Sequence, residues 1–140
     1  MTLSSGEVLS IVVWVSQTMG TPSPNLDDLT IKPVSPHGMA QVACPVPSPG
    51  VIVLCPNLGY YNPKTNMLYL ADWLSEEYTK SFMVHEIVHW FQDEALKVNG
   101  EQCGEALLAL EEQAYGIQCR YNKTKLLVEW CLRPVPTRKC

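Results

Sequence analysis

The segment SFMVHEIVHWFQDEAL, residues 81–96, constrains the fold of this chain more than any other stretch. If it is helical, apolar side chains stand on nearly every side of it, which predicts a helix that is buried almost all round. Ser75-Glu76-Glu77 supplies an N-cap and an acidic first turn ahead of it. We expect this helix to run to about Lys97 and to stop at Asn99-Gly100. Because it is buried almost all round, the other elements have to pack around it.

The centre of the segment reads His85-Glu86-Ile87-Val88-His89, which is H-E-x-x-H. On a helix the two histidines stand one turn apart on one face, and imidazoles so placed can hold a zinc ion at about 2.0–2.1 Å each. Glu86 is rotated about 100° from His85, beside a metal-bound water rather than the metal, where a zinc hydrolase has its general base. The alternative is a pair of core histidines that are hydrogen-bonded to backbone or to a carboxylate.

A second motif lies downstream, because Glu111-Glu112-Gln113-Ala114 contains E-x-x-A. Together the two motifs resemble the zincin metallopeptidases and, among them, the gluzincins. Residues 61–70, which read Y-N-P-x-T-N-x-x-Y-L, are similar to the lead-in of the minigluzincins. The resemblance covers residues 79–121 and implies a zinc-dependent metallopeptidase, in which a glutamate on a second helix completes the metal site.

Helix phase selects Glu111 rather than Glu112 as that third ligand. If residues 103–121 are helical, steps of about 100° per residue put Glu111 at the border of the apolar face and Glu112 at the edge of the wet face. A carboxylate at that border is costly to bury without a cation, which zinc supplies. The alternative is a helix glutamate whose carboxylate reaches out to solvent.

Peptide hydrolysis through a tetrahedral intermediate needs a further hydrogen-bond donor for the oxyanion. Tyr115 lies one turn after Glu111 and is our candidate for this catalytic role. Tyr60, Tyr61 and His37 are alternatives among which the sequence does not choose. A purely structural role of Tyr115, holding the two helices apart, is an equal alternative.

The resemblance also implies where a peptide or protein substrate would bind. It makes Asn66–Ala71, just before the H-E-x-x-H helix, the sheet edge with which an extended substrate pairs. Two rival functions belong to other classes. One is a zinc-dependent amidase of a non-protein substrate, and the other is a non-catalytic, disulfide-rich zinc-binding interaction module.

Length and charge exclude several classes of partner. A chain of 140 residues, 46% of them hydrophobic, fits a single domain spanning residues 1–140. The formal net charge is −4 and no basic stripe is present, which argues against nucleic acid. No run approaches the ~20 apolar residues of a membrane span. We expect a monomer that binds no nucleic acid and does not span a membrane.

Six cysteines without a C-x-x-C pair indicate a disulfide-stapled protein from an oxidising compartment, either secreted or periplasmic. The first lysine is Lys32, so we expect any leader to be absent from this sequence. The alternative is buried free thiols in a cytosolic protein. Asn122-Lys123-Thr124 has the form of a glycosylation sequon, a triplet that also arises by chance.

At least two disulfides are expected, and one pairing is excluded. Cys103 and Cys119 would lie about 24 Å apart along a helix, whereas a disulfide needs Cα atoms within about 7 Å. A hairpin would bring Cys44 near Cys55. The two remaining cysteines, at 131 and 140, are expected to staple the C-terminal tail to the body.

The order of elements predicts an α+β fold with a small twisted sheet on one side of the H-E-x-x-H helix. Ser4-Ser5-Gly6-Glu7 is a capping box that begins an N-terminal helix, which Gly20 ends. Short strands are expected at residues 29–34, 39–43, 51–54 and 67–70, and the glutamate-bearing helix at 103–121. Pro33 confines the first strand to an edge or an end. The last strand closes a hairpin with Tyr60–Tyr61 or with the segment before Pro56.

Overall fold

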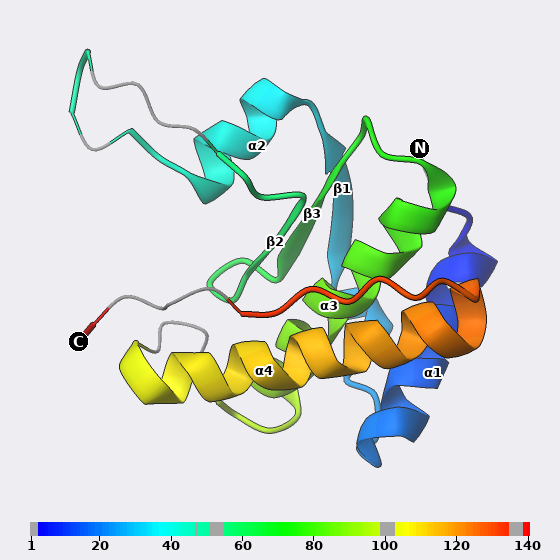
Figure 1. Ribbon diagram of the computed structural model, residues 1–140. Coiled ribbons are helices and arrows are strands. Elements are labelled where there is room, and N and C mark those ends of the chain that lie inside the picture. Colours follow the sequence, from blue (N-terminus) through cyan, green and yellow to red (C-terminus); the bar gives the residue numbers. More distant parts are fainter. Residues whose placement is uncertain (1–2, 47, 51–54, 99–102, 135–138) are drawn as a thin grey trace.

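A computed structural model of the protein describes residues 3–46, 48–50, 55–98, 103–134 and 139–140. Its elements are α1 (Ser5–Met19), η1 (Leu26–Asp28), β1 (Thr30–Val34), α2 (Pro36–Ala43), β2 (Gly59–Asn62), β3 (Met67–Ala71), α3 (Glu76–Glu94), α4 (Gly104–Tyr121) and η2 (Asn122–Leu126). The predicted α+β fold is confirmed. Helix α3 lies at the centre and contacts α1, α4, β2 and β3 (Figure 1). No helix within these ranges is long and apolar enough to cross a membrane.

Helix α3 is buried on nearly every side, as predicted. Val84, Ile87, Val88, Trp90 and Phe91 are all 0% exposed. They pack against α1 on one side and against Leu68 and Leu70 of the sheet on another. The H-E-x-x-H segment is therefore fixed by the core of the molecule.

The end of α3 differs from the prediction. The helix stops at Glu94 rather than near Lys97. The N–H of Leu96 bonds to the Phe91 carbonyl, which widens the last turn, and Lys97 adopts a left-handed backbone with φ of 56°. The stop expected at Asn99-Gly100 lies outside the described residues.

The N-terminal helix begins and ends as predicted. The Ser4 hydroxyl accepts a hydrogen bond from the Glu7 N–H at 3.2 Å, and the Glu7 carboxylate accepts one from the Ser4 N–H at 3.0 Å. Gly20 ends α1 in the left-handed region with φ of 63°. These two signals are local in the sequence, so both ends of α1 could be predicted from it.

The described strands form one sheet in the order β1-β3-β2. Strand β1 runs parallel to β3, with Thr30 opposite Met67 and Val34 opposite Ala71. Strand β2 runs antiparallel to β3, so the hairpin partner is the Tyr60–Tyr61 segment. Strand β1 lies at the edge of the sheet, as its proline predicts.

The expectation that Asn66–Ala71 forms the substrate-binding sheet edge is wrong. Strand β3 is central, and its backbone pairs with β1 on one side and β2 on the other. A substrate cannot pair with groups that are already hydrogen-bonded. Among the described strands, the edge that lies beside α3 is β2, since β1 occupies the opposite edge.

The strand predicted at residues 39–43 is also wrong, because these residues belong to α2. Ser35 caps the helix by accepting a hydrogen bond from the Gly38 N–H at 3.1 Å, and Pro36 occupies its first turn. Met39 of α2 packs with Tyr69 and Ala71, on the sheet face opposite to α3. The strand predicted at residues 51–54 lies outside the described residues.

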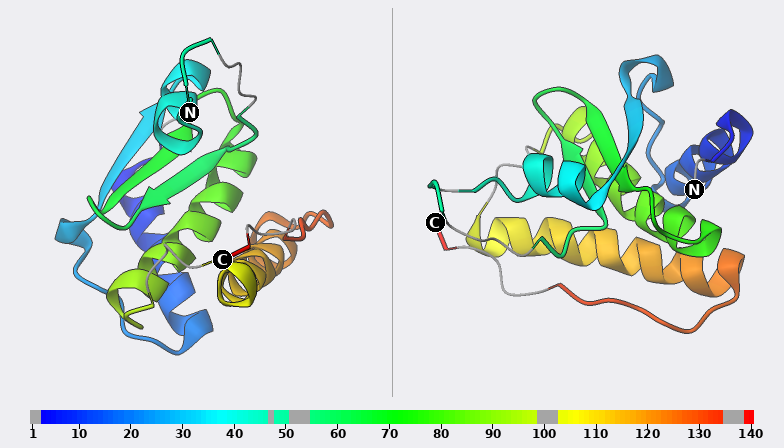
Figure 2. Two further views of the ribbon diagram at one scale, coloured as in Figure 1. Left: turned by 90° about the vertical axis from the view of Figure 1, so that its left-hand side faces the viewer. Right: turned by 90° about the horizontal axis from the view of Figure 1, so that it is seen from above.

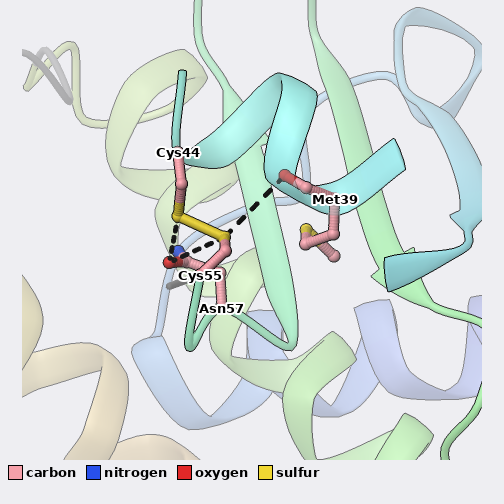
Figure 3. Close-up of a disulfide and its surroundings, with 4 residues drawn as sticks. All are labelled: Met39, Cys44, Cys55 and Asn57. Atoms are coloured by element: carbon pink, nitrogen blue, oxygen red, sulfur yellow. Dashed lines mark hydrogen bonds between the residues drawn. A yellow bond between two sulfur atoms is a disulfide. The ribbon is translucent and has the colours of Figure 1, made fainter. Parts of the chain in front are cut away.

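A disulfide joins the C-terminal end of α2 to the segment that leads into β2. Cys44 and Cys55 form this bond, with their Cα atoms 5.6 Å apart (Figure 3). Asn57 Oδ1 lies 3.4 Å from the Cys44 sulfur and 3.8 Å from the Cys55 sulfur. The expected proximity of these two cysteines is confirmed, although a helix and not a hairpin produces it.

Two more disulfides tie the C-terminal tail to α4. They pair Cys103 with Cys140 and Cys119 with Cys131. The tail runs back alongside α4 (Figures 1 and 2). All six cysteines lie among the described residues and none is free, which agrees with an extracellular protein.

The segment after α4 has little regular structure. One turn of π-helix, η2, ends at Leu126, and the chain then continues irregularly to residue 134. Trp130 stacks on Tyr78 of α3, with ring centroids 5.1 Å apart. Asn122 of the sequon is 0% exposed and donates a hydrogen bond to the Trp130 carbonyl at 3.1 Å. The folded chain therefore does not present this asparagine for glycosylation.

Candidate metal centre

His85 and His89 of α3 and Glu111 of α4 come together at one point. The Nε2 atoms of the histidines are 3.2 Å apart. The Glu111 carboxylate lies 2.5 Å from His89 Nε2 and 3.7 Å from His85 Nε2. One ligand atom from each residue lies within 4.8 Å of the others, so these three residues, here called the ligand group, can hold a metal ion. Glu112 is exposed and stands apart from this group, as helix phase predicts.

Two glutamines orient the histidine rings. His85 Nδ1 lies 3.0 Å from Gln118 Oε1, and His89 Nδ1 lies 2.8 Å from Gln92 Oε1. The Gln92 amide nitrogen donates to the Leu110 carbonyl at 3.0 Å, which fixes the amide with its oxygen toward the histidine. An amide oxygen only accepts, so each Nδ1 carries a proton, and in the neutral form of each ring it is an Nε2 lone pair that faces Glu111.

These lone pairs and the carboxylate repel one another unless a cation lies between them. Without a metal, a proton on the His89 imidazole can take the place of this cation. Burial alone would lower the pKa of His89, but the hydrogen bond that its ring donates to the Glu111 carboxylate and the charge of Glu86 raise this pKa to about 9. Burial would raise the pKa of Glu111, but its hydrogen bonds to the two histidines hold it far below its usual range. The residues present therefore suit a divalent cation.

Glu86 lies beside this group without joining it. It is 7% exposed and follows His85 directly in the buried part of α3. Its side chain lies against Gly59 of β2, since a Cβ built there would stand 2.9 Å from Glu86 Cγ and 3.1 Å from its Oε2. Glu86 lines the same cavity as the three ligand candidates, which is the relation that the H-E-x-x-H spacing predicts.

A cavity of about 730 Å³ lies over the group, between β2 with its flanks and α4. Residues 56–64 form one wall, and Leu107, Leu110 and Leu132 contribute apolar side chains. The backbone of β2 also directs hydrogen-bonding groups to the side that faces away from β3. Because the Ala71 N–H bonds to the Leu58 carbonyl, pairing alternates so that the backbone N–H and C=O of Gly59 and Tyr61 point away from β3.

The other candidates for catalysis are placed unequally. The Tyr115 ring lies 4.3 Å from the His85 ring and lines the cavity. Burial and the charges of Glu111 and Glu86 raise the pKa of Tyr115, which keeps its hydroxyl protonated. Tyr60 also lines the cavity.

Two alternatives are less well placed. The Tyr61 hydroxyl donates to Asp93 at 2.7 Å, so it is engaged at the far end of α3. His37 is exposed on α2 and does not line the cavity. Tyr115, whose ring contacts the His85 ring, therefore remains our candidate, and its role in catalysis stays a prediction.

Sequence reasoning missed Gln92, Gln118 and Gly59. Weak signals existed for two of them. Gln92 follows His89 by three residues on the same helix face, and Gln118 follows Glu111 by two turns. The contact between Gly59 and Glu86 depends on how β2 docks onto α3, which has no local signal.

No protein-family model, curated protein or solved structure matches this chain.

Proposed function

We propose that the protein is a secreted, zinc-dependent metallopeptidase of the gluzincin type. The observation that carries the proposal is the convergence of two Nε2 lone pairs and one carboxylate at the floor of a cavity, with a second carboxylate beside them. Two imidazoles and a carboxylate are the ligand set of catalytic zinc sites in several peptidases. Such a set is poor in the oxygen ligands that Mg²⁺ and Ca²⁺ require.

The residues divide into clear roles. His85, His89 and Glu111 would hold the zinc, which when bound polarises the scissile carbonyl and lowers the pKa of water toward ~7. The Glu86 carboxylate takes the proton of the attacking water and passes it to the leaving amine. The Tyr115 hydroxyl, kept protonated by its surroundings, can donate a hydrogen bond to the developing oxyanion.

Strand β2 supports a peptide as the substrate. The outward N–H and C=O groups of Gly59 and Tyr61 can pair with an extended peptide beside the ligand group. The substrate would lie between β2 and α4, where the leucines of the cavity wall can receive apolar side chains. This position replaces the one first expected at residues 66–71.

The first test measures metal and hydrolysis together. Protein purified without added metal should contain about one zinc per chain by elemental analysis, and should cleave casein or a peptide library. Glu86→Gln should keep the zinc and lose about 10²–10⁴-fold in kcat, because it removes the base without removing a ligand. Glu112→Gln makes the same chemical change on the exposed side of α4 and should leave both readouts near wild type.

Other results would favour the rival functions. Zinc binding without cleavage of any peptide, and with no effect of Glu86→Gln on any activity, would favour a non-catalytic module. Cleavage confined to non-peptide amides would favour an amidase. A protein that binds no zinc at micromolar concentrations would contradict all three.

A further inference from the structure

We infer that Gly59 is a positioning residue that sets the place of the Glu86 carboxylate. This inference rests on the proposed function and adds a residue to it. A Cβ built at Gly59 would stand 2.9 Å from Glu86 Cγ, 3.1 Å from Oε2 and 3.4 Å from Cδ. The Glu86 side chain thus packs against Gly59 from its Cγ atom to its carboxylate.

Glycine is needed here for space and not for backbone conformation. Gly59 lies in a paired strand opposite Leu70, with ordinary strand backbone rather than the left-handed region. An L-residue can adopt that backbone without strain. Its Cβ, however, would be far closer to Glu86 than the usual van der Waals contact of about 3.5–4.0 Å between carbon atoms.

Neither backbone can retreat easily from an added methyl group. Glu86 sits in the buried middle of α3, and Ile87 and Val88 beside it are 0% exposed. Strand β2 is held by its pairing with β3 and by the hydrogen bond from Tyr61 to Asp93 of α3. The Glu86 side chain therefore has to change rotamer, which moves its carboxylate within the site.

We expect the ligand group to keep its position when the Glu86 side chain changes rotamer. The three closest atoms to a Cβ at Gly59 all belong to Glu86, and none belongs to the histidines or Glu111. The same glycine also directs its backbone N–H and C=O to the free edge of β2. One residue thus links the alignment of an extended substrate to the position of the base.

The catalytic test is Gly59→Ala. Zinc stoichiometry should stay at the wild-type value, while kcat should fall about 10²-fold, as a displacement of about 1 Å can cause. KM should change by less than about threefold, because the backbone of β2 is retained. Gly116→Ala is the matched control, since the same methyl group on α4 meets no atom within 4 Å and should leave kcat unchanged.

A thermal test reads the contact without any activity. Gly59→Ala should lower Tm by roughly 3–8 °C in the wild type. In a Glu86→Ala background, which removes the atoms in the way, the same change should lower Tm by less than about 2 °C.

The outcomes separate the two proposals. Wild-type kcat in Gly59→Ala, or equal losses of Tm in both backgrounds, would overturn the role of Gly59. If the wild type binds no zinc and cleaves nothing, the proposed function fails. The Tm comparison then still decides whether Gly59 fixes the Glu86 side chain.

Discussion

Gln92 and Gln118 approach the two histidines from different helices, and both are neutral. Each fixes a ring by accepting a hydrogen bond from its Nδ1–H without adding charge. The site already contains the carboxylates of Glu111 and Glu86, which together balance one divalent cation. A carboxylate in place of either glutamine would leave an excess negative charge in a largely buried site, which is costly. The amides thus supply orientation while the charge of the site stays balanced.

The ligand role of Glu111 can be tested against its neighbour in the sequence. Glu111→Ala should lower zinc affinity by more than the roughly 10–100-fold that loss of an outer hydrogen-bond partner costs. Glu112→Ala should leave affinity near wild type, because Glu112 is exposed and outside the ligand group. Competition with a chromophoric chelator measures both. Loss of zinc from Glu112→Ala with retention in Glu111→Ala would show that the assigned helix phase is wrong.

The ligand group was predictable from sequence because both of its signals are helical. The spacing of His85 and His89, and the phase of Glu111 on its helix, depend only on about 3.6 residues per turn. Gln92 and Gln118 were not predicted, since a glutamine on an amphipathic helix has many possible partners. The candidate ligands were thus predictable from local geometry, but the residues that orient them depend on the packing of α3 on α4.

Among the elements, the helices α1, α3 and α4 and the strands β1 and β3 were predicted, whereas α2 and the order of the strands in the sheet were not. Ser4 and Ser75 cap the N-terminal ends of α1 and α3 as expected. The strand expected at residues 39–43 is a helix because Ser35 and Pro36 supply a start signal that outweighs the apolar residues after it. The central position of β3 arises from a parallel pairing with β1, and such distant pairing leaves no local pattern in either strand.

The capping box of α1 gives a pH-dependent prediction. Hydrogen bonds from the backbone and side chain of Ser4, and the nearby Lys80 ammonium, lower the pKa of Glu7 to about 2. A carboxyl whose pKa is lower in the folded state stabilises the fold above its unfolded pKa of 4.5, and this contribution disappears as pH falls through about 2.

Glu7→Gln tests this contribution, because glutamine can still complete a capping box and only the charge is lost. The variant should be less stable than wild type at pH 7 in urea unfolding. The difference should shrink between pH 4.5 and about 2 and vanish below that. A difference that stays constant across this range would mean that the carboxylate charge does not stabilise α1.

At the scale of the whole molecule, covalent bonds reinforce the helix pair that carries the site. Two of the three disulfides fasten the tail to α4, and Trp130 of that tail stacks on Tyr78 of α3. The tail therefore ties α3 to α4 near the cavity, where Leu132 forms part of the wall. In a chain of this size, such cross-links add stability chiefly by restricting the unfolded state.

A metal ion at the ligand group would link the same two helices, so zinc should stabilise the whole fold. At a free concentration of about 100 times its Kd, zinc adds about 2.7 kcal/mol to the free energy of unfolding. For a chain of this length we expect Tm to rise by roughly 5–15 °C. Mg²⁺ at the same concentration should have no such effect, because it prefers six oxygen ligands.

Calorimetry with a chelator and with Glu111→Ala completes this test. The chelator should return the wild type to its metal-free Tm, and Glu111→Ala should lose most of the zinc-induced shift because α4 then supplies no ligand. The disulfides remain intact in both cases, so the shift reports only the noncovalent link between α3 and α4. A full zinc-induced shift in Glu111→Ala would show that zinc binds the folded protein at some other place.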